Sequence, residues 1–253
     1  MLQLQLMTHS NATISKEMRK QQILDRIAEL QIELEKLERK PRMLELFKGT
    51  GSIGKIAEEM GYEVVSLDIL EKYKPTIVSD IMEWDYTQYE PEYFEVIWSS
   101  PECKIFSNLQ NTHCMKPGKT QADYKRKMKW ENMDQLKAAQ QENGKFVEQV
   151  LKIIKYFKPE YWFIENPWTS AMRNLEFMKD LPCYRFDYCR FDYPYKKPTR
   201  VWTNKEFEDI KCNCKRDSKT GKKHKISIGG KGDTTTLDQR YSIPPELVKH
   251  LLG

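Results

Sequence analysis

Residues 43–68 read MLELFKGTGSIGKIAEEMGYEVVSLD, and this stretch decides the fold. Met43–Phe47 is a short apolar segment that predicts a strand, and the turn Gly49-Thr50-Gly51 that follows opens a helix. A second apolar segment, Glu63–Leu67, predicts another strand, which ends at Asp68. Strand, helix and strand joined by short loops are the repeating unit of a parallel sheet whose faces are covered by helices.

The same alternation continues along the chain. One long helix is predicted at about residues 134–157, and the further predicted strands are residues 75–79, 95–99, 161–164, 184–188 and 199–203. We therefore expect an α/β protein with a mostly parallel, twisted sheet and helices on both faces, in a domain of residues 42–204.

The N-terminal region differs from the rest. Residues 1–13 are polar without periodicity and are predicted to be disordered, whereas residues 14–41 predict a charged amphipathic helix that stops at Pro41. Ile23, Ile27, Leu30, Leu34 and Leu37 recur at alternating spacings of four and three along it. Two interpretations stay open: the stripe pairs with a second copy of the chain, or it packs on the body of the domain.

Composition bounds the class of protein. The chain has 253 residues, of which 39% are hydrophobic and 31% charged, with no apolar run of membrane-spanning length and no secretory signal pattern. Its six cysteines follow irregular spacings, unlike a disulfide framework. We expect an intracellular protein, of cytoplasm or nucleus, without a membrane partner.

Positive charge is unevenly distributed. The net charge is only +5, but Lys211–Lys225 holds seven basic residues and one acidic residue, and Lys116–Lys129 is a second basic cluster. Both clusters are compatible with solvated loops. The alternative is contact with nucleic-acid phosphates, where each lysine or arginine displaces a counterion.

The glycine turn and two aspartates predict a cofactor site. Asp68 follows Gly51 by seventeen residues at the end of the next strand, the usual position of a carboxylate that binds ribose hydroxyls. Asp80, after the third strand, is placed to accept from an adenine amino group. The pattern indicates an adenosine-containing cofactor, although each aspartate could instead cap its loop.

Three residues further along carry possible chemistry. Cys103 follows a strand and the turn Ser100-Pro101, so its thiol lies where open α/β sheets place reactive groups; it is either a nucleophile or a buried structural cysteine. Glu165, in WFIENP, ends the next strand, and Arg200 lies in a late strand.

These motifs in this order resemble the DNA cytosine-5 methyltransferases: Phe-x-Gly-x-Gly, a strand-end Asp, Pro-x-Cys with Phe-Ser behind it, Glu-Asn, then Arg before an apolar and aromatic pair. The resemblance covers roughly Met43–Trp202 and, more weakly, Arg240–Glu246. It implies a Rossmann-like fold that uses S-adenosylmethionine, and a compact type familiar from phages and large DNA viruses.

The resemblance also implies roles for individual residues. Cys103 would add to carbon 6 of cytosine, Glu165 would protonate or hydrogen-bond ring nitrogen 3, and Arg200 would hold the exocyclic oxygen of a flipped-out base in double-stranded DNA. The loop from Lys104 to about Lys129, which carries Ser107 and His113, would close over it. The residues implied for cofactor binding are Phe47, Gly49, Thr50, Gly51, Asp68, Ile69, Asp80, Ile81 and Ser100.

The chain departs from the family pattern at three positions. Glu102 separates Pro101 from the cysteine, Pro167 follows Glu-Asn where valine is usual, and Pro198 replaces the first of two arginines. A carboxylate at position 102 should raise the pKa of the Cys103 thiol, while Lys104 should lower it.

The resemblance implies that the C-terminal part of the chain, residues 205–253, includes a region that recognises DNA. Residues 205–237 stand where the family keeps its target-recognition region, and residues 238–253 are expected to return to the catalytic domain. This short, lysine-rich region offers few side chains to base edges, which predicts a recognition site of roughly two to four base pairs. Cys212, Cys214 and His224 form part of a zinc pattern with Cys189 as the only candidate for a fourth ligand; free surface thiols without metal are the favoured interpretation.

Two alternatives of function stay open. One is an RNA cytosine-5 methyltransferase with the same chemistry. The other is a catalytically inactive nucleic-acid-binding protein on the same fold, which the three departures would suit. An amino-group methyltransferase is disfavoured, because residues 100–103 lack the second proline and the aromatic residue of that motif.

Overall fold

The computed structural model describes residues 2–219, 221, 223–226, 228, 233 and 235–253, and only the backbone of residues 2–15, 36 and 37. The chain divides into two units, one ending at Pro41 and the other spanning Arg42–Gly253. The first is a single helix, α1 (Leu2–Glu38). The second holds the sheet, its covering helices and the site.

The described part of the second unit contains seven strands and four α-helices. The strands are β1 (Arg42–Leu46), β2 (Glu63–Asp68), β3 (Ile77–Val78), β4 (Val96–Ser99), β5 (Tyr161–Pro167), β6 (Cys183–Asp187) and β7 (Pro198–Thr203). The helices are α2 (Ser52–Glu59), α3 (Met133–Phe157), α4 (Leu237–Tyr241) and α5 (Pro245–Leu252).

The strands form one sheet in the order β3-β2-β1-β4-β5-β7-β6. The first five are parallel to one another, whereas β7 runs antiparallel to both β5 and β6. The chain order reverses between β1 and β4, which is the position at which open α/β sheets bind ligands beyond the carboxyl ends of their strands. This confirms the predicted α/β class and gives a Rossmann-like, methyltransferase-type sheet.

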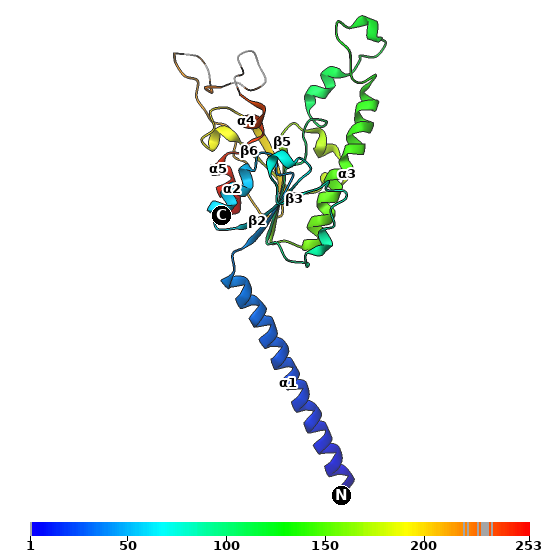
Figure 1. Ribbon diagram of the computed structural model, residues 1–253, viewed down its shortest axis with the longest axis vertical. Helices are drawn as coiled ribbons and strands as arrows, with labels where there is room; N and C mark the ends of the chain where they lie inside the picture. The colour runs from blue at the N-terminus through cyan, green and yellow to red at the C-terminus, as the bar shows by residue number, and fades with distance from the viewer. Residues whose placement is uncertain (1, 220, 222, 227, 229–232, 234) are drawn as a thin grey trace. The chain divides into compact units, whose positions relative to one another are not determined.

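Helices cover both faces of the sheet, with α3 on one side and α2 and α5 on the other (Figure 1). Alternate side chains of each central strand enter opposite cores: Leu44 packs with α3, while Met43 packs with α2 and α5. Both are fully buried, and each contributes about 1.5–3 kcal/mol relative to an exposed position. Strands buried on both faces explain the near-continuous apolar runs in the sequence.

The C-terminal helix completes the second of these cores. Leu247, Val248 and Leu251 of α5 are fully buried and pack in the same cluster as Ile53 and Ala57 of α2. The C-terminal helix therefore packs within the same compact unit as the sheet, which spans Arg42–Gly253.

Element boundaries follow the sequence-based expectations closely, with one difference at the N-terminus. α1 begins at Leu2, inside the segment 1–13 that was predicted to be disordered. No glycine or proline occurs before Pro41, so no residue of this segment interrupts the helical backbone. Residues 1–13 lack apolar periodicity, but the helix extends through them all the same. Among the described residues, no helix is both long and apolar enough to cross a bilayer.

Candidate active site

A cleft of about 460 Å³ opens at the carboxyl ends of the parallel strands. Eight of the nine predicted cofactor residues line it, together with two of the three predicted catalytic residues: Phe47, Gly49, Thr50, Asp68, Ile69, Asp80, Ile81, Ser100, Cys103 and Glu165. Gly51 and Arg200 do not line it. Residues that are up to 118 positions apart in sequence thus share one cavity because parallel strands present their ends at the same edge.

The glycine turn after β1 requires left-handed backbone. Gly49 and Gly51 have φ values of 49° and 69°, and Phe47, which is not a glycine, has φ of 57°. Any side chain at the two glycine positions would be strained, and a Cβ at Gly51 would approach the Lys48 Cε to 3.0 Å. Gly51 therefore shapes the turn and the start of α2 without lining the cleft.

Both strand-end aspartates hold loops as well as facing the cleft. Asp68 accepts hydrogen bonds from the backbone N–H groups of Gly49 and Leu70, each at 2.8 Å. Asp80 accepts from the N–H of Met82 at 2.9 Å. The interpretations left open by the sequence are thus compatible, because each carboxylate caps a loop and still lines the cavity.

Glu45 is a cleft residue that sequence reasoning missed. It lies in β1 with 2% of its surface exposed, and one carboxylate oxygen accepts from the N–H of Gly54 at 3.2 Å. The other oxygen has no hydrogen-bond partner among the described residues. Burial raises the pKa of this carboxyl to about 7. The sequence signal that could have identified Glu45 is its position as the only acidic residue in the apolar run Met43–Phe47.

Cys103 and Glu165 are brought together by adjacent strands. β4 and β5 pair in parallel with Ser99 opposite Ile164, so the segments beyond both strand ends meet in the cleft. The side-chain amide of Asn166 donates to the carbonyl of Pro101 at 2.9 Å and fixes the turn that carries the thiol. Asn166 acts on this turn as a positioning residue that the Glu-Asn motif had already singled out.

Burial disfavours the charged forms of both the Cys103 thiol and the Glu165 carboxyl. Burial raises the pKa of the Cys103 thiol, and nearby Glu165 raises it further, while Lys197 opposes both. Glu102 also raises it, as the sequence predicted, but Lys197 replaces Lys104 as the cation that lowers it. Burial raises the pKa of Glu165 as well, against the effects of Lys197 and of the Tyr188 hydroxyl, which donates to Glu165 at 3.5 Å.

This raised thiol pKa has a measurable consequence. Because the thiolate is the reactive form, alkylation of Cys103 by iodoacetamide in the free protein should be slow near neutral pH and should still be rising above pH 9.0, the ordinary pKa of a cysteine thiol. Mass spectrometry of the Cys103 peptide over that range measures it. A rate that is already maximal near neutral pH would contradict the raised pKa.

Arg200 lies elsewhere than the sequence predicted. Its guanidinium stacks on the ring of Trp168, 4.0 Å from the centroid, and one of its terminal nitrogens lies 3.4 Å from the Cys183 sulfur. Arg200 pairs in register with Asn166 on β5, and its side chain shares a face of β7 with Trp202, two residues further on. This stacking keeps it out of the cleft.

Lys197 instead supplies the cation next to the catalytic pair. It lines the cleft, and its ammonium donates to the carbonyl of Arg240 at 2.9 Å and to the Tyr188 hydroxyl at 3.5 Å. Tyr241, which follows Arg240, also lines the cleft. The C-terminal segment therefore helps to build the site, as its weak resemblance to the family suggested.

The loop after Cys103 is anchored at its base. Ile105 and Phe106 line the cleft, and the carbonyl of Ile105 accepts from Gln140 of α3 at 3.1 Å. Further out, Gln110 accepts from the Trp130 indole at 3.0 Å. Ser107 caps a short 3-10 helix that ends at His113, and neither residue lines the cleft.

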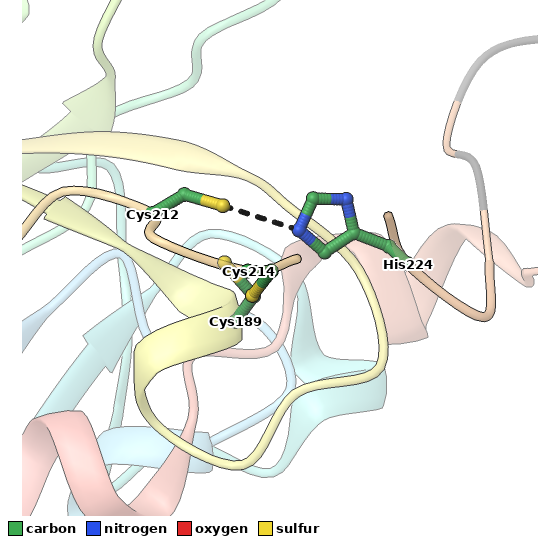
Figure 2. A group of neighbouring side chains, drawn as sticks. All are labelled: Cys189, Cys212, Cys214 and His224. Carbon is green, nitrogen blue, oxygen red and sulfur yellow. Dashed lines mark hydrogen bonds between the residues drawn. The ribbon is translucent and has the colours of Figure 1, made fainter. Parts of the chain in front are cut away.

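A second group of reactive side chains lies apart from the cleft. Cys212, Cys214 and His224 lie together with Cys189, and none of the four lines the cavity (Figure 2). The ligand atoms of all four lie within 4.8 Å of one another. The sequence favoured free surface thiols over zinc ligands, and the fold brings these three half-buried thiols and the imidazole to one point.

No protein-family model matches this chain. A probable DNA (cytosine-5)-methyltransferase of frog virus 3 (isolate Goorha) is 32% identical over 226 residues, which cover 83% of this chain and 98% of that protein. The match therefore spans essentially the whole relative.

Solved structures are more distant. A prophage-encoded E. coli protein described as a candidate DNA modification methyltransferase has 10% identity and a TM-score of 0.44, covering 64% of this chain and 46% of its own. A DNMT2 mutant of Spodoptera frugiperda has 17% identity and a TM-score of 0.39, covering 64% and 49%. Structural similarity at this level carries no argument about function. The 32% identity to the viral relative does carry one, and it shows that the chain belongs to the DNA (cytosine-5)-methyltransferase family.

Proposed function

We propose that the protein transfers a methyl group from S-adenosylmethionine to carbon 5 of cytosine in DNA, through a covalent bond between Cys103 and the base. The observation that carries the proposal is the cleft itself, in which Cys103 and Glu165 lie with the glycine turn and both strand-end aspartates. The name of the viral relative supports cytosine in DNA as the substrate.

The residues of the cleft fit the cofactor. Asp68 would bind the ribose hydroxyls and Asp80 the adenine amino group, between the apolar side chains of Ile69 and Ile81. Glu45, whose buried oxygen has no partner among the described residues, suits a cationic group beside the glycine turn. When bound, S-adenosylmethionine supplies the methyl group.

The remaining chemistry belongs to the chain. The Cys103 thiol loses its proton to solvent and its sulfur forms a bond to carbon 6 of cytosine, while Glu165, whose pKa is raised by burial, gives a proton to ring nitrogen 3 as charge builds there. Carbon 5 then takes the methyl group, a base removes the proton of carbon 5, and the electron pair of that C–H bond restores the ring double bond as the Cys103 thiolate leaves. Ring nitrogen 3 returns its proton to the Glu165 carboxylate, and the thiolate regains a proton from solvent. We assign to Lys197, which lines the cleft, the role of the cation that holds the exocyclic oxygen of cytosine; Arg200 does not line the cleft.

The cytosine must leave the helix for this reaction. A base stacked in a duplex exposes neither face of carbon 6 to a buried thiol, so we infer that it is flipped into the cleft. The loop of residues 104–129, anchored at Ile105 and bearing lysines at its tip, is suited to close over it and to contact phosphates.

Recognition of sequence is expected to be loose. Residues 205–237 carry many lysines but few side chains that read base edges, so methylation of random-sequence DNA should show a preference over roughly two to four base pairs. Bisulfite sequencing of the product measures this preference, with untreated DNA as its control. A long and strict motif would contradict it.

We also propose that α1 pairs with its counterpart in a second copy of the chain. Ile27, Leu30 and Leu34 of its apolar stripe are 45%, 48% and 54% exposed. Ile27→Glu together with Leu30→Glu should halve the mass in solution, measured by light scattering, because like charges would replace the apolar seam. The matched control, Ile32→Glu, changes an equally apolar residue off the stripe and should leave the mass unchanged. An unaltered mass in the double variant would contradict pairing through this stripe.

Trapping on 5-fluorocytosine tests the reaction. Fluorine at carbon 5 cannot be removed as a proton, so wild-type protein incubated with fluorinated DNA and S-adenosylmethionine should form an adduct that survives denaturation and maps to the Cys103 peptide. Omission of the cofactor should prevent it. An adduct formed on fluorinated RNA alone would favour the RNA methyltransferase, and none on either polymer would favour the inactive binding protein.

A further inference from the structure

Outside the cleft, the described residues gather three thiols and one imidazole at a single point. They come from the turn after β6 and from two places in the region 205–237 (Figure 2). Their ligand atoms lie within 4.8 Å of one another, and the Cys212 sulfur is 3.3 Å from Nε2 of His224. We propose that Cys189, Cys212, Cys214 and His224 bind one structural zinc ion.

The distances suit tetrahedral coordination. Zn–S bonds of about 2.3 Å and Zn–N bonds of about 2.0–2.1 Å place two sulfurs about 3.8 Å apart and a sulfur about 3.5 Å from a nitrogen. The observed limit of 4.8 Å is about 1 Å wider than the sulfur–sulfur spacing, so side-chain rotations would draw the four atoms together as the ion binds. All four residues are half-buried, so the site is reachable from solvent and partly shielded from it.

The donor set selects the metal and its role. Thiolates and imidazole favour zinc over calcium or magnesium, which prefer oxygen ligands. Four protein ligands complete the tetrahedron and leave no open position for water or substrate. The ion would therefore hold structure rather than take part in methyl transfer.

Backbone pairing places part of the site before any metal binds. The N–H of Ile210 donates to the carbonyl of Arg185 at 2.7 Å, and the N–H of Asp187 donates to the carbonyl of Ile210 at 2.9 Å. The N–H of Cys212 donates to the carboxylate of Asp187 at 2.8 Å. Asp187 lies two residues before Cys189, so this bond holds two of the ligands near each other. A hydrogen bond from the backbone of a ligand to a fixed carboxylate is the kind of outer-shell contact that orients metal ligands.

His224 is the ligand that the metal would add to this arrangement. Between Cys214 and His224 the chain carries the basic residues of 215–223. Coordination at both ends would close this segment into a short loop and fix its lysines and arginine on one side of the domain. Contact of that loop with DNA rests on the proposed function, whereas the binding of the ion does not.

Metal content is the direct test. Full-length protein purified under reducing conditions and dialysed against metal-free buffer should retain one zinc ion per chain by elemental analysis. Replacement by Co²⁺ should give the visible absorption of tetrahedral cobalt together with sulfur-to-metal charge-transfer bands. Wild-type protein that holds no zinc and shows no such spectrum after reduction and reconstitution overturns the proposal.

Variants identify the ligands. Cys212→Ser and His224→Ala should lose the zinc, whereas His224→Cys should keep it because a fourth thiolate can replace the imidazole. Cys183→Ser and Cys103→Ser are the matched controls, since they remove thiols outside the cluster and should retain one ion per chain. Full zinc occupancy in both ligand variants would refute the site even if methyl transfer is intact. Loss of methyl transfer in Cys103→Ser with zinc retained separates the two proposals.

Proteolysis of the wild-type protein tests for bound zinc without requiring that any variant folds. Removal of zinc by a chelator should speed tryptic cleavage at Lys215–Lys225, while residues 42–204 should resist as before. Restoring zinc should restore the protection. Cleavage at an unchanged rate would show that no metal orders this segment.

Discussion

Replacing Cys103 by alanine is expected to lower kcat/KM for DNA methylation by about 10⁴-fold or more, the scale on which the loss of a covalent nucleophile acts. No other cysteine lines the cleft among the described residues, so no neighbouring thiol can substitute for it. Transfer of labelled methyl groups to DNA under single-turnover conditions measures the chemical step.

The controls separate chemistry from binding. Cofactor affinity, measured by calorimetry, should be nearly unchanged in Cys103→Ala, because the glycine turn, Asp68 and Asp80 lie on other strand ends. Cys183→Ala removes a half-buried thiol outside the cleft and should retain activity. Methyl transfer by Cys103→Ala within tenfold of the wild-type rate would eliminate covalent catalysis at this residue.

Replacing Lys197 by methionine should lower kcat by about 10²–10³-fold. This is the usual effect of removing one preorganised group that stabilises negative charge developing in the transition state, here on the exocyclic oxygen of cytosine. Lys197 acts on both catalytic groups, since it opposes the raised pKa of Cys103 and of Glu165. Its loss should therefore raise both pKa values further. Alkylation of Cys103 should then require a higher pH than in the wild type, which a loss of stability alone would not cause.

Arg200→Met is the matched comparison. Its guanidinium stacks on Trp168 outside the cleft, so the expected result is a lower melting temperature, from a lost cation–π contact of about 0.5–2 kcal/mol, with a smaller effect on kcat than Lys197→Met. Lys197→Arg should recover part of the activity. A larger loss of kcat in Arg200→Met than in Lys197→Met would return the role to the arginine.

The sequence by itself determined the sheet, the turn and most of the cleft. Apolar runs and glycine positions are local properties, and they located each strand to within a few residues. Parallel strands then bring their carboxyl ends to one edge without further information, so Asp68, Cys103 and Glu165 could be assigned to one site before any coordinates.

Tertiary structure alone decided which cation faces that site. Arg200 pairs in register with Asn166, which does line the cleft, so strand register alone does not exclude the arginine. Its guanidinium instead stacks on the ring of Trp168, whereas Lys197, just before β7, lines the cleft. No local pattern encodes this stacking, because Trp168 and Arg200 are 32 positions apart and meet through the pairing of distant segments.

The sequence named Cys189, Cys212, Cys214 and His224 as a zinc pattern, but only the fold shows that they meet. Cys189 and Cys212 are separated by 22 intervening residues, and the pairing of Ile210 with the strand before Cys189 brings them together. Burial of Glu45 likewise depends on packing, since α2 lies against it and the N–H of Gly54 donates to its carboxylate. Local sequence determined which groups could react, and non-local packing determined which of them meet.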